Sequence, residues 1–146
     1  MDRADREFLA AERRNIEVTL EMLCEASSDP NPSDLERIGT ATLLQNLYTG
    51  MERILRFLLQ ARAIKVPPSG SWHKDLLARA VEGGIITHVL ADNLMQLLLF
   101  RHVHVHGYAF RIEASRIQPL IDSAPATVQR FFSETDKIIT GDGLSN

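Results

Sequence analysis

The chain has 146 residues, which is the length of one domain. Hydrophobic residues make up 45% of it and charged residues 24%, a balance that excludes a disordered chain and indicates a globular protein with a core of its own. The net charge of −3 argues against a protein that coats nucleic acid through charge alone, but it leaves room for a local basic site.

The sequence also indicates the compartment. The one cysteine, Cys24, excludes an internal disulfide and suits a reducing environment, and we expect its side chain to be buried as an apolar filler. The longest nearly unbroken apolar run, residues 94–100, is too short to span a bilayer. Residues 1–14 are dense in charge and lack the apolar segment of a signal peptide. We therefore expect a cytoplasmic protein that does not bind membranes.

Two long helices are predicted in the first half of the chain. Apolar residues recur at helical spacing over residues 2–26, without glycine or proline. The next helix begins after Ser33, because the sequence Ser-Asp-Leu-Glu over residues 33–36 is a capping box in which Glu36 reaches back to the cap. We expect this helix to continue to about Ile64 and to kink, if anywhere, at one of its glycines.

Three further helices are predicted after the proline-rich linker at residues 67–70. A short one starts with Ser71 as its N-cap, places Trp72 as a core anchor and ends at the glycine pair 83–84. Another begins near Thr87 and continues into residues 100–108. The last covers about residues 115–139; Pro119 is tolerated in a first turn, whereas Pro125 predicts a kink or a break.

No segment is convincing as a strand, although the alternating His102, His104 and His106 would also line one face of a strand. We therefore predict an all-α protein, an up-and-down bundle of four to five helices. One domain is expected over residues 1–140, followed by a flexible tail at residues 141–146.

The groups best able to move protons or bind phosphate are concentrated in residues 100–108, Phe-Arg-His-Val-His-Val-His-Gly-Tyr. Three of the five histidines lie here, directly after a leucine-rich run. Taken singly, each histidine also has a structural explanation, because an imidazole near the end of a helix interacts favourably with the helix dipole. Only the combination of residues points to chemistry.

A metal site is one interpretation of this segment. His102 and His106 are four residues apart, so both lie on one face of a helix, as many metal sites require. However, no carboxylate or cysteine lies nearby in the sequence, and Asp92 is several helical turns away. A metal-dependent bundle enzyme stays an alternative, while we expect no bound metal and no other cofactor.

Cleavage of RNA without a metal is the other chemical interpretation. The 2′-hydroxyl of RNA is an internal nucleophile, so an enzyme needs only to move protons and to stabilise the charge that develops on the phosphate. Histidine titrates in the useful range, and arginine offers paired donors to the phosphate oxygens. A single protomer offers few such groups, which favours a site shared across a dimer.

The order Arg101, four residues, His106, one residue, Tyr108 resembles the R-x4-H-x-Y motif of the HEPN superfamily, in particular of the HepT-like ribonuclease toxins. Residues 45–55 resemble the second helix of that family. Residues 68–77 and 98–102 resemble its connector and its approach to the site. The resemblance thus covers about residues 46–108.

The resemblance implies a homodimer in which Arg101 and His106 of each protomer are catalytic residues in a shared cleft. It implies metal-independent RNA cleavage that leaves a 2′,3′-cyclic phosphate, and a toxin–antitoxin pair with an MNT-type nucleotidyltransferase. In related systems that partner silences the toxin by transferring AMP to the motif tyrosine, here Tyr108; the added bulk and negative charge would occupy the place of an RNA phosphate. His102, where many relatives carry asparagine, and His104 are expected to support the site or contact RNA.

Three residues outside the motif are expected to lie behind the site. Tyr48 and Glu52 are one helical turn apart, and His73 follows the tryptophan of the connector. A buried tyrosine, a surface carboxylate and a structural histidine are the alternative explanations. Because some HEPN relatives lack nuclease activity, the alternative function is a non-catalytic helical module that binds a nucleotide or a nucleotidyltransferase.

Overall fold

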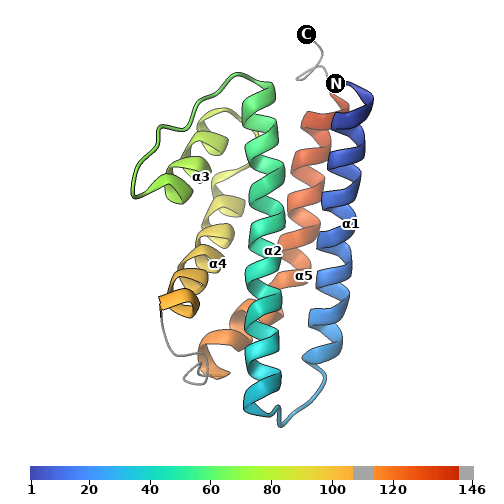
Figure 1. The fold of residues 1–146 in the computed structure, drawn as a ribbon, viewed down its shortest axis with the longest axis vertical. Coiled ribbons are helices and arrows are strands. Elements are labelled where there is room, and N and C mark those ends of the chain that lie inside the picture. The colour runs from blue at the N-terminus through green and yellow to red at the C-terminus, as the bar shows by residue number, and fades with distance from the viewer. Residues whose placement is uncertain (107–113, 142–146) are drawn as a thin grey trace.

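The computed structural model describes residues 1–106 and 114–141 and, for residues 103–106, the path of the helix. Five α-helices make up this part of the chain: α1 (Arg3–Ala26), α2 (Asp34–Ala61), α3 (Trp72–Glu82), α4 (His88–His106) and α5 (Ala114–Thr140). The long helices α1, α2, α4 and α5 run alternately down and up, and the short α3 lies on the way from α2 to α4 (Figure 1). The predicted all-α, up-and-down bundle is confirmed. The homodimer, the domain limits and the tail stay predictions, and residues 142–146 lie outside the described residues.

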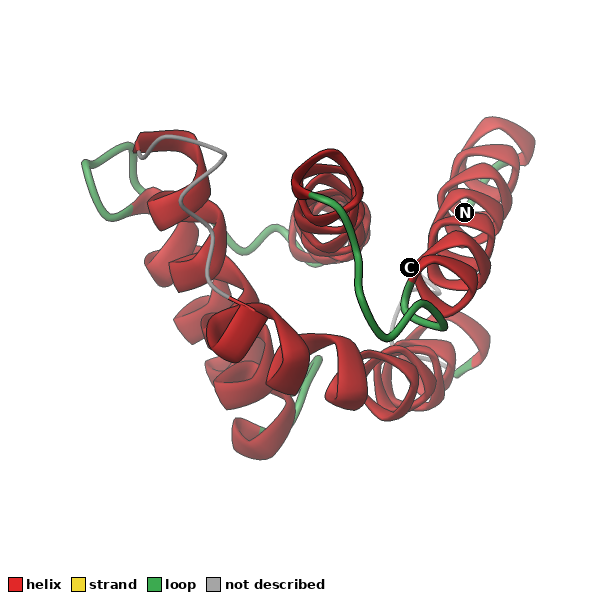
Figure 2. Cartoon of the chain, turned by 90° about the horizontal axis from the view of Figure 1, so that it is seen from below, coloured by secondary structure: helices red, strands yellow, loops and turns green. Residues whose placement is uncertain are grey.

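Helix α2 is the centre of the bundle, since it contacts each of the other four helices. Its neighbours α1 and α4 lie on opposite sides of it (Figure 1). Figure 2 shows the same helices from below, with no strand among the described residues. Their buried side chains form one core. The side chains that fill this core from α2 are buried: Leu44, Leu47, Tyr48, Met51, Ile54, Leu55, Leu58 and Leu59. None of the helices over the described residues is long and apolar enough to cross a membrane.

The predicted start of α2 is confirmed, with one difference at its cap. The hydroxyl of Ser33 accepts a hydrogen bond from the backbone N–H of Glu36 at 3.1 Å. It also donates to the Glu36 carboxylate at 3.1 Å, so the carboxylate is engaged by the hydroxyl rather than by the backbone of the cap residue. Local chemistry therefore places the start of the helix correctly.

Helix α2 ends earlier than predicted, at Ala61 rather than near Ile64. Ala63 has a left-handed backbone, with φ 57°, and its N–H donates to the carbonyl of Gln60 at 3.0 Å. The N–H of Ile64 donates to the carbonyl of Leu59 at 2.9 Å. These two bonds form a Schellman motif, which normally uses glycine at the left-handed position, so the sequence carried no signal for it.

Of the two glycines in α2, Gly50 is the one against which α1 packs closely, and α2 is continuous at this residue. A Cβ at this position would lie 2.8 Å from Cγ1 of Ile16, a buried side chain of α1. At Gly39, in the same helix, a Cβ would meet nothing within 4 Å. The absence of a side chain at Gly50 thus allows α1 to pack closely on α2, and it does not produce the kink that we expected at one of the glycines.

Of the kink or break predicted in the last helix, no break occurs, because α5 continues through both Pro119 and Pro125. The first turns of α5 lean away from the axis of the remainder, so a bend accommodates the prolines (Figure 1). Pro119 is the sixth residue of α5, beyond the first turn where it was expected. Packing over the following turns, where Val128 and Phe131 are buried, holds the helix together despite the lost hydrogen bonds.

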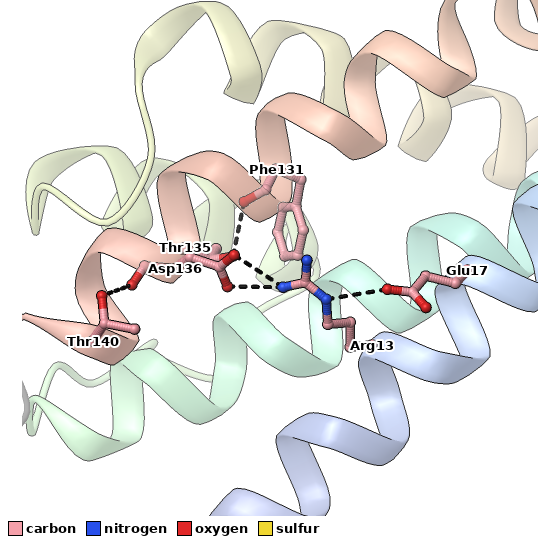
Figure 3. Close-up of polar contacts among 6 residues, drawn as sticks. All are labelled: Arg13, Glu17, Phe131, Thr135, Asp136 and Thr140. Carbon is pink, nitrogen blue, oxygen red and sulfur yellow. Dashed lines mark hydrogen bonds and ion pairs between the residues drawn. The ribbon is translucent and has the colours of Figure 1, made fainter.

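A polar contact closes the bundle between its first and last helices (Figure 3). Arg13 of α1 donates from Nη1 to both carboxylate oxygens of Asp136 in α5, at 2.9 and 3.0 Å, and from Nε to Glu17 at 3.1 Å. Its guanidinium also lies 4.1 Å above the ring of Phe132. The charged groups are about half exposed, so the contact adds on the order of 1 kcal/mol at most, and its main effect is to set where α1 meets α5.

Two expectations for single residues need correction. Cys24 is exposed rather than buried, because it lies on the outer side of the last turn of α1, next to the buried Leu23. Trp72 packs against the core but stays half-buried, since it stands at the first position of α3 beside the linker. Ser71 is the N-cap of α3 as predicted, but its hydroxyl bonds to the carboxylate of Asp75 at 3.2 Å instead of to a backbone N–H.

The two glycines of α2 give a matched prediction. Gly39→Ala should raise the free energy of unfolding by about 0.5–1 kcal/mol, because alanine loses less backbone entropy in a helix. Gly50→Ala should lack this gain and lower stability by about 1–3 kcal/mol, since its Cβ overlaps Ile16. Urea denaturation followed by circular dichroism measures both. In an Ile16→Ala background the gain at position 50 should return; equal stabilisation at both glycines in the wild-type background would contradict the packing argument.

Candidate functional site

Helix α4 carries the motif and is fixed to the bundle along its length. At its start, the backbone N–H and the hydroxyl of Thr87 both donate to the carboxylate of Glu134 in α5. The Thr87 hydroxyl also accepts from the N–H of Leu90. Four buried leucines then anchor the helix to α2, α3 and α5: Leu90, Leu94, Leu97 and Leu98. Because these contacts leave little freedom in rotation, they determine where Arg101 stands.

Arg101 lies against the centre of the bundle rather than in solvent. Its Cζ atom is 5.9 Å from the centre of the ring of Tyr48, a fully buried residue of α2. Its Nη1 atom is buried and has no hydrogen-bond partner among the described residues. A guanidinium donor without a partner is costly in a protein interior. Such a donor favours an anion that brings an acceptor to it.

Behind Arg101, a chain of hydrogen bonds leads from α2 to α3. The hydroxyl of Tyr48 donates to Oε2 of Glu52 at 2.6 Å. Nδ1 of His73 lies 2.7 Å from the same oxygen. The Glu52 side chain is 11% exposed and that of His73 is 45% exposed, so the chain runs from the core to the surface. The three residues expected behind the site are thus found in one network next to Arg101.

The hydrogen-bond partners determine which atoms of Tyr48 and His73 carry a hydrogen. Burial, and then the neighbouring Glu52, raise the pKa of Tyr48, while Arg101 acts in the opposite direction with a smaller effect. The tyrosine therefore keeps its proton and donates it. Because Oε2 of a carboxylate only accepts, His73 donates from Nδ1, and its Nε2 is an acceptor whenever the ring is neutral.

The structure places Arg101 next to the network of Tyr48, Glu52 and His73, and the rest of the motif lies largely outside the described residues. His102 is exposed on the last turns of α4. The helical backbone reaches His104 and His106, whereas their side chains, and all of Tyr108, lie outside the described residues. The pairing of Arg101 with His106 hence stays a prediction. No cluster of three metal-ligating side chains occurs among the described residues.

One neighbour of the network was missed in the sequence. Cζ of Arg56 lies 5.6 Å from the centre of the Trp72 ring, and Trp72 meets His73 edge-on, with ring centres 5.2 Å apart. Tyr48, Glu52 and Arg56 are spaced by four residues, which places them on successive turns along one side of α2. That spacing was a usable signal for Arg56, but its proximity to Trp72 depends on how the linker folds back.

The network predicts a stability difference that depends on pH. Tyr48→Phe removes a buried hydrogen bond to a carboxylate and should lower the free energy of unfolding by about 1.5–3 kcal/mol at neutral pH. The unfolded tyrosine releases its proton above about pH 10, and the folded one retains it because its pKa is raised. The unfolded state then binds fewer protons, so wild-type stability falls as pH rises.

Above pH 10, the wild type should therefore lose about 1.4 kcal/mol per pH unit relative to Tyr48→Phe. Urea denaturation of both proteins between pH 8 and 11.5 measures the difference, in which contributions common to both proteins cancel. A difference that stays constant over this range would contradict the assignment of the proton to Tyr48.

Comparison with known proteins supports the resemblance noted in the sequence. A family model described as HepT-like protein matches residues 39–141, which include most of α2, all of α3, α4 and α5, and every position of the motif. No curated protein and no solved structure matches the chain. Since the family model covers well over half of the sequence, the chain belongs to the family of HepT-like proteins.

Proposed function

We propose that the protein is a metal-independent endoribonuclease that cleaves RNA by attack of the 2′-hydroxyl on the adjacent phosphate. It would act as the toxin of a toxin–antitoxin pair. The observation that carries the proposal is Arg101: its guanidinium is held over Tyr48 with a buried donor that has no partner among the described residues. This arginine is the first position of the motif in a HepT-like chain.

In the proposed reaction, Arg101 binds the non-bridging oxygens of the scissile phosphate and stabilises the charge that develops on them. His106 takes the proton of the 2′-hydroxyl and returns it to the leaving 5′-oxygen. The products are a 2′,3′-cyclic phosphate and a 5′-hydroxyl, so atoms and charges balance without a cofactor. His102 and His104 are proposed to contact the RNA or to shape the site.

Tyr48, Glu52 and His73 are proposed to position Arg101 rather than to touch RNA. The ring of Tyr48 lies next to the guanidinium, and the hydroxyl is held by Glu52. His73 holds Glu52 from the other helix. A rigid support of this kind keeps a charged donor aimed at the phosphate instead of at solvent.

A site built from two copies of the chain fits the geometry of α4. Arg101 and His106 are five positions apart, which on an α-helix separates them by about 140° around the axis. Two facing copies allow the arginine of one protomer to work with the histidine of the other. Leu99, two residues before Arg101, is 43% exposed. It lines a depression of about 350 Å³ with Phe100, Pro119 and Leu120, an apolar surface suited to such an interface.

RNA cleavage should occur with EDTA present and should depend on the motif. His106→Ala should slow it by about 10²–10⁴-fold, because a general acid or base is lost. Arg101→Ala should slow it by at least about 10²-fold, and Arg101→Lys should restore little, since a lysine lacks the paired donors. A fluorogenic RNA substrate measures the rates. His88→Ala, at an exposed position of the same helix, is the control and should cleave at the wild-type rate.

Mixed dimers test the shared site. When Arg101→Ala and His106→Ala proteins are refolded together, about half of the dimers are mixed and each contains one intact pair, so about a quarter of wild-type activity should return. No recovery would place both residues in one protomer. Unchanged cleavage by both single variants, or cleavage only with a divalent metal, would contradict the proposed function; nucleotide binding without any cleavage would favour a non-catalytic module.

Tyr108 is the proposed point of control. Coexpression with a cognate MNT-type nucleotidyltransferase should add the mass of AMP to the peptide that contains Tyr108, because the transferred phosphate places negative charge where RNA must bind. Mass spectrometry of that peptide measures the addition. The modified protein should no longer cleave RNA, and Tyr108→Phe should stay active in the presence of the partner. An unmodified peptide in a silenced complex would contradict this mode of control.

A further inference from the structure

A pocket of about 430 Å³ lies between the second half of α2, the linker after it and the start of α3. Its volume is in the range of small-ligand sites. The walls combine an aromatic plane, apolar side chains and two cations: Trp72, Leu59, Ile64, Val66, Arg56 and Lys65. No acidic residue lines it. The early end of α2 at Ala61 and the left-handed Ala63 create it, because they turn the linker back along the helix.

The aromatic plane is Trp72, which is half-buried. The guanidinium of Arg56 lies over the ring, with its Cζ 5.6 Å from the ring centre, and His73 meets the ring at its edge, at 84° between planes. Because Arg56 is an exposed side chain that a base can displace, a ring held in this way offers a preset surface for stacking. Nucleobases stack on such rings whatever their sequence, because every base has a π-face.

The cations are placed for a phosphate beside a stacked base. Arg56 and Lys65 are both exposed side chains that line the pocket. An aromatic plane next to two positive groups is the combination by which proteins hold single-stranded nucleic acid. A purely apolar ligand would gain nothing from Arg56 and Lys65, and a free anion would gain nothing from Trp72.

The pocket adjoins the proposed site through shared elements. Tyr48, Glu52 and Arg56 occupy successive turns of α2, so Arg56 is about 12 Å from Tyr48 along the helix. Trp72 directly precedes His73, the outer residue of the network behind Arg101. One short strand of RNA can therefore reach both places.

We propose that this pocket binds one nucleotide of single-stranded RNA, with its base against Trp72 and its phosphate between Arg56 and Lys65. The pocket thereby holds the substrate at a point away from the scissile phosphate. The identity of the ligand as RNA rests on the proposed function, whereas binding of a base with its phosphate does not.

Trp72 is the only tryptophan, so its fluorescence reports on the pocket directly. The probe is a hexamer of adenylate with 2′-O-methyl groups, which lacks the attacking hydroxyl and cannot be cleaved. Adding it to the full chain should quench the fluorescence of Trp72. An abasic hexamer of the same backbone should quench little, and AMP should bind more weakly than the hexamer, because only a strand also reaches Arg101.

Variants measured by anisotropy of the labelled hexamer separate the contributions. Trp72→Leu should weaken binding by about 5- to 150-fold, and Trp72→Phe should weaken it less, because an aromatic plane remains. Arg56→Gln and Lys65→Gln should each reduce the slope of log affinity against log salt by about 0.7, the loss expected for one phosphate contact with a single strand. Arg130→Gln removes one charge from an exposed position of α5 outside the pocket and should leave the slope unchanged.

Each result is decisive for the pocket. Quenching by the hexamer, with the expected loss in the Trp72 and Arg56 variants, supports the nucleotide pocket. It does so even if no preparation cleaves RNA; the absence of cleavage would overturn the proposed ribonuclease and not the pocket. Cleavage of RNA by the wild type without quenching, or equal affinity of Trp72→Leu, Arg56→Gln and the wild type, overturns the pocket. Equal affinity for AMP and the hexamer overturns the assignment to RNA, and equal affinity for the abasic hexamer overturns recognition of the base.

Discussion

The burial of α2 is the constraint on which the other elements depend. Eleven residues of this helix are buried, and it touches every other helix, so α1, α3, α4 and α5 are each placed by what α2 presents to them. The missing side chain at Gly50 lets α1 pack close to α2, and α4 packs on the same helix, whose leucines are buried. Each buried leucine contributes on the order of 2 kcal/mol. A polar side chain on such a helix must therefore be held by a partner, and Tyr48 has that partner in Glu52, one turn away.

This arrangement explains how an arginine is tolerated at the end of an apolar helix. The quadrupole of the Tyr48 ring attracts the guanidinium of Arg101, and the hydroxyl of that ring is held by Glu52. Charge interactions are stronger there than in solvent, because less water screens them. The same partial burial that makes the arginine costly makes it a strong ligand for an anion, so the chain can have a net charge of −3 and still present a positive site.

Local sequence signals predicted where the helices begin. They did not predict the features that tertiary packing determines. Ser33 caps α2 as expected, since its side chain acts on the backbone next to it, and Ser71 stands at the cap position of α3 although its hydroxyl bonds to a side chain instead. The end of α2 depends on Ala63, a residue without preference for the left-handed region, which the packing of the linker holds there. Pro125 predicted a kink or a break because the hydrogen bonds lost at a proline are a local cost. The helix does not break, because the buried face of α5 outweighs this cost, and that face is a tertiary property.

In the candidate site, too, the contacts that depend on local spacing could be predicted from the sequence, and those that depend on the tertiary fold could not. The spacing of Tyr48 and Glu52 on one helix was visible in the sequence, because i and i+4 positions always meet. His73 stands 21 positions further on, and its contact with Glu52 exists only because the linker returns α3 to the side of α2. That same return brings Trp72 to Arg56. A single feature, the end of α2 at Ala61 followed by the left-handed Ala63, thus closes the network behind Arg101 and forms the pocket beside it. A longer α2, ending at Ile64 as the pattern of apolar residues suggested, would carry the linker further along the bundle and separate the two helices at both contacts.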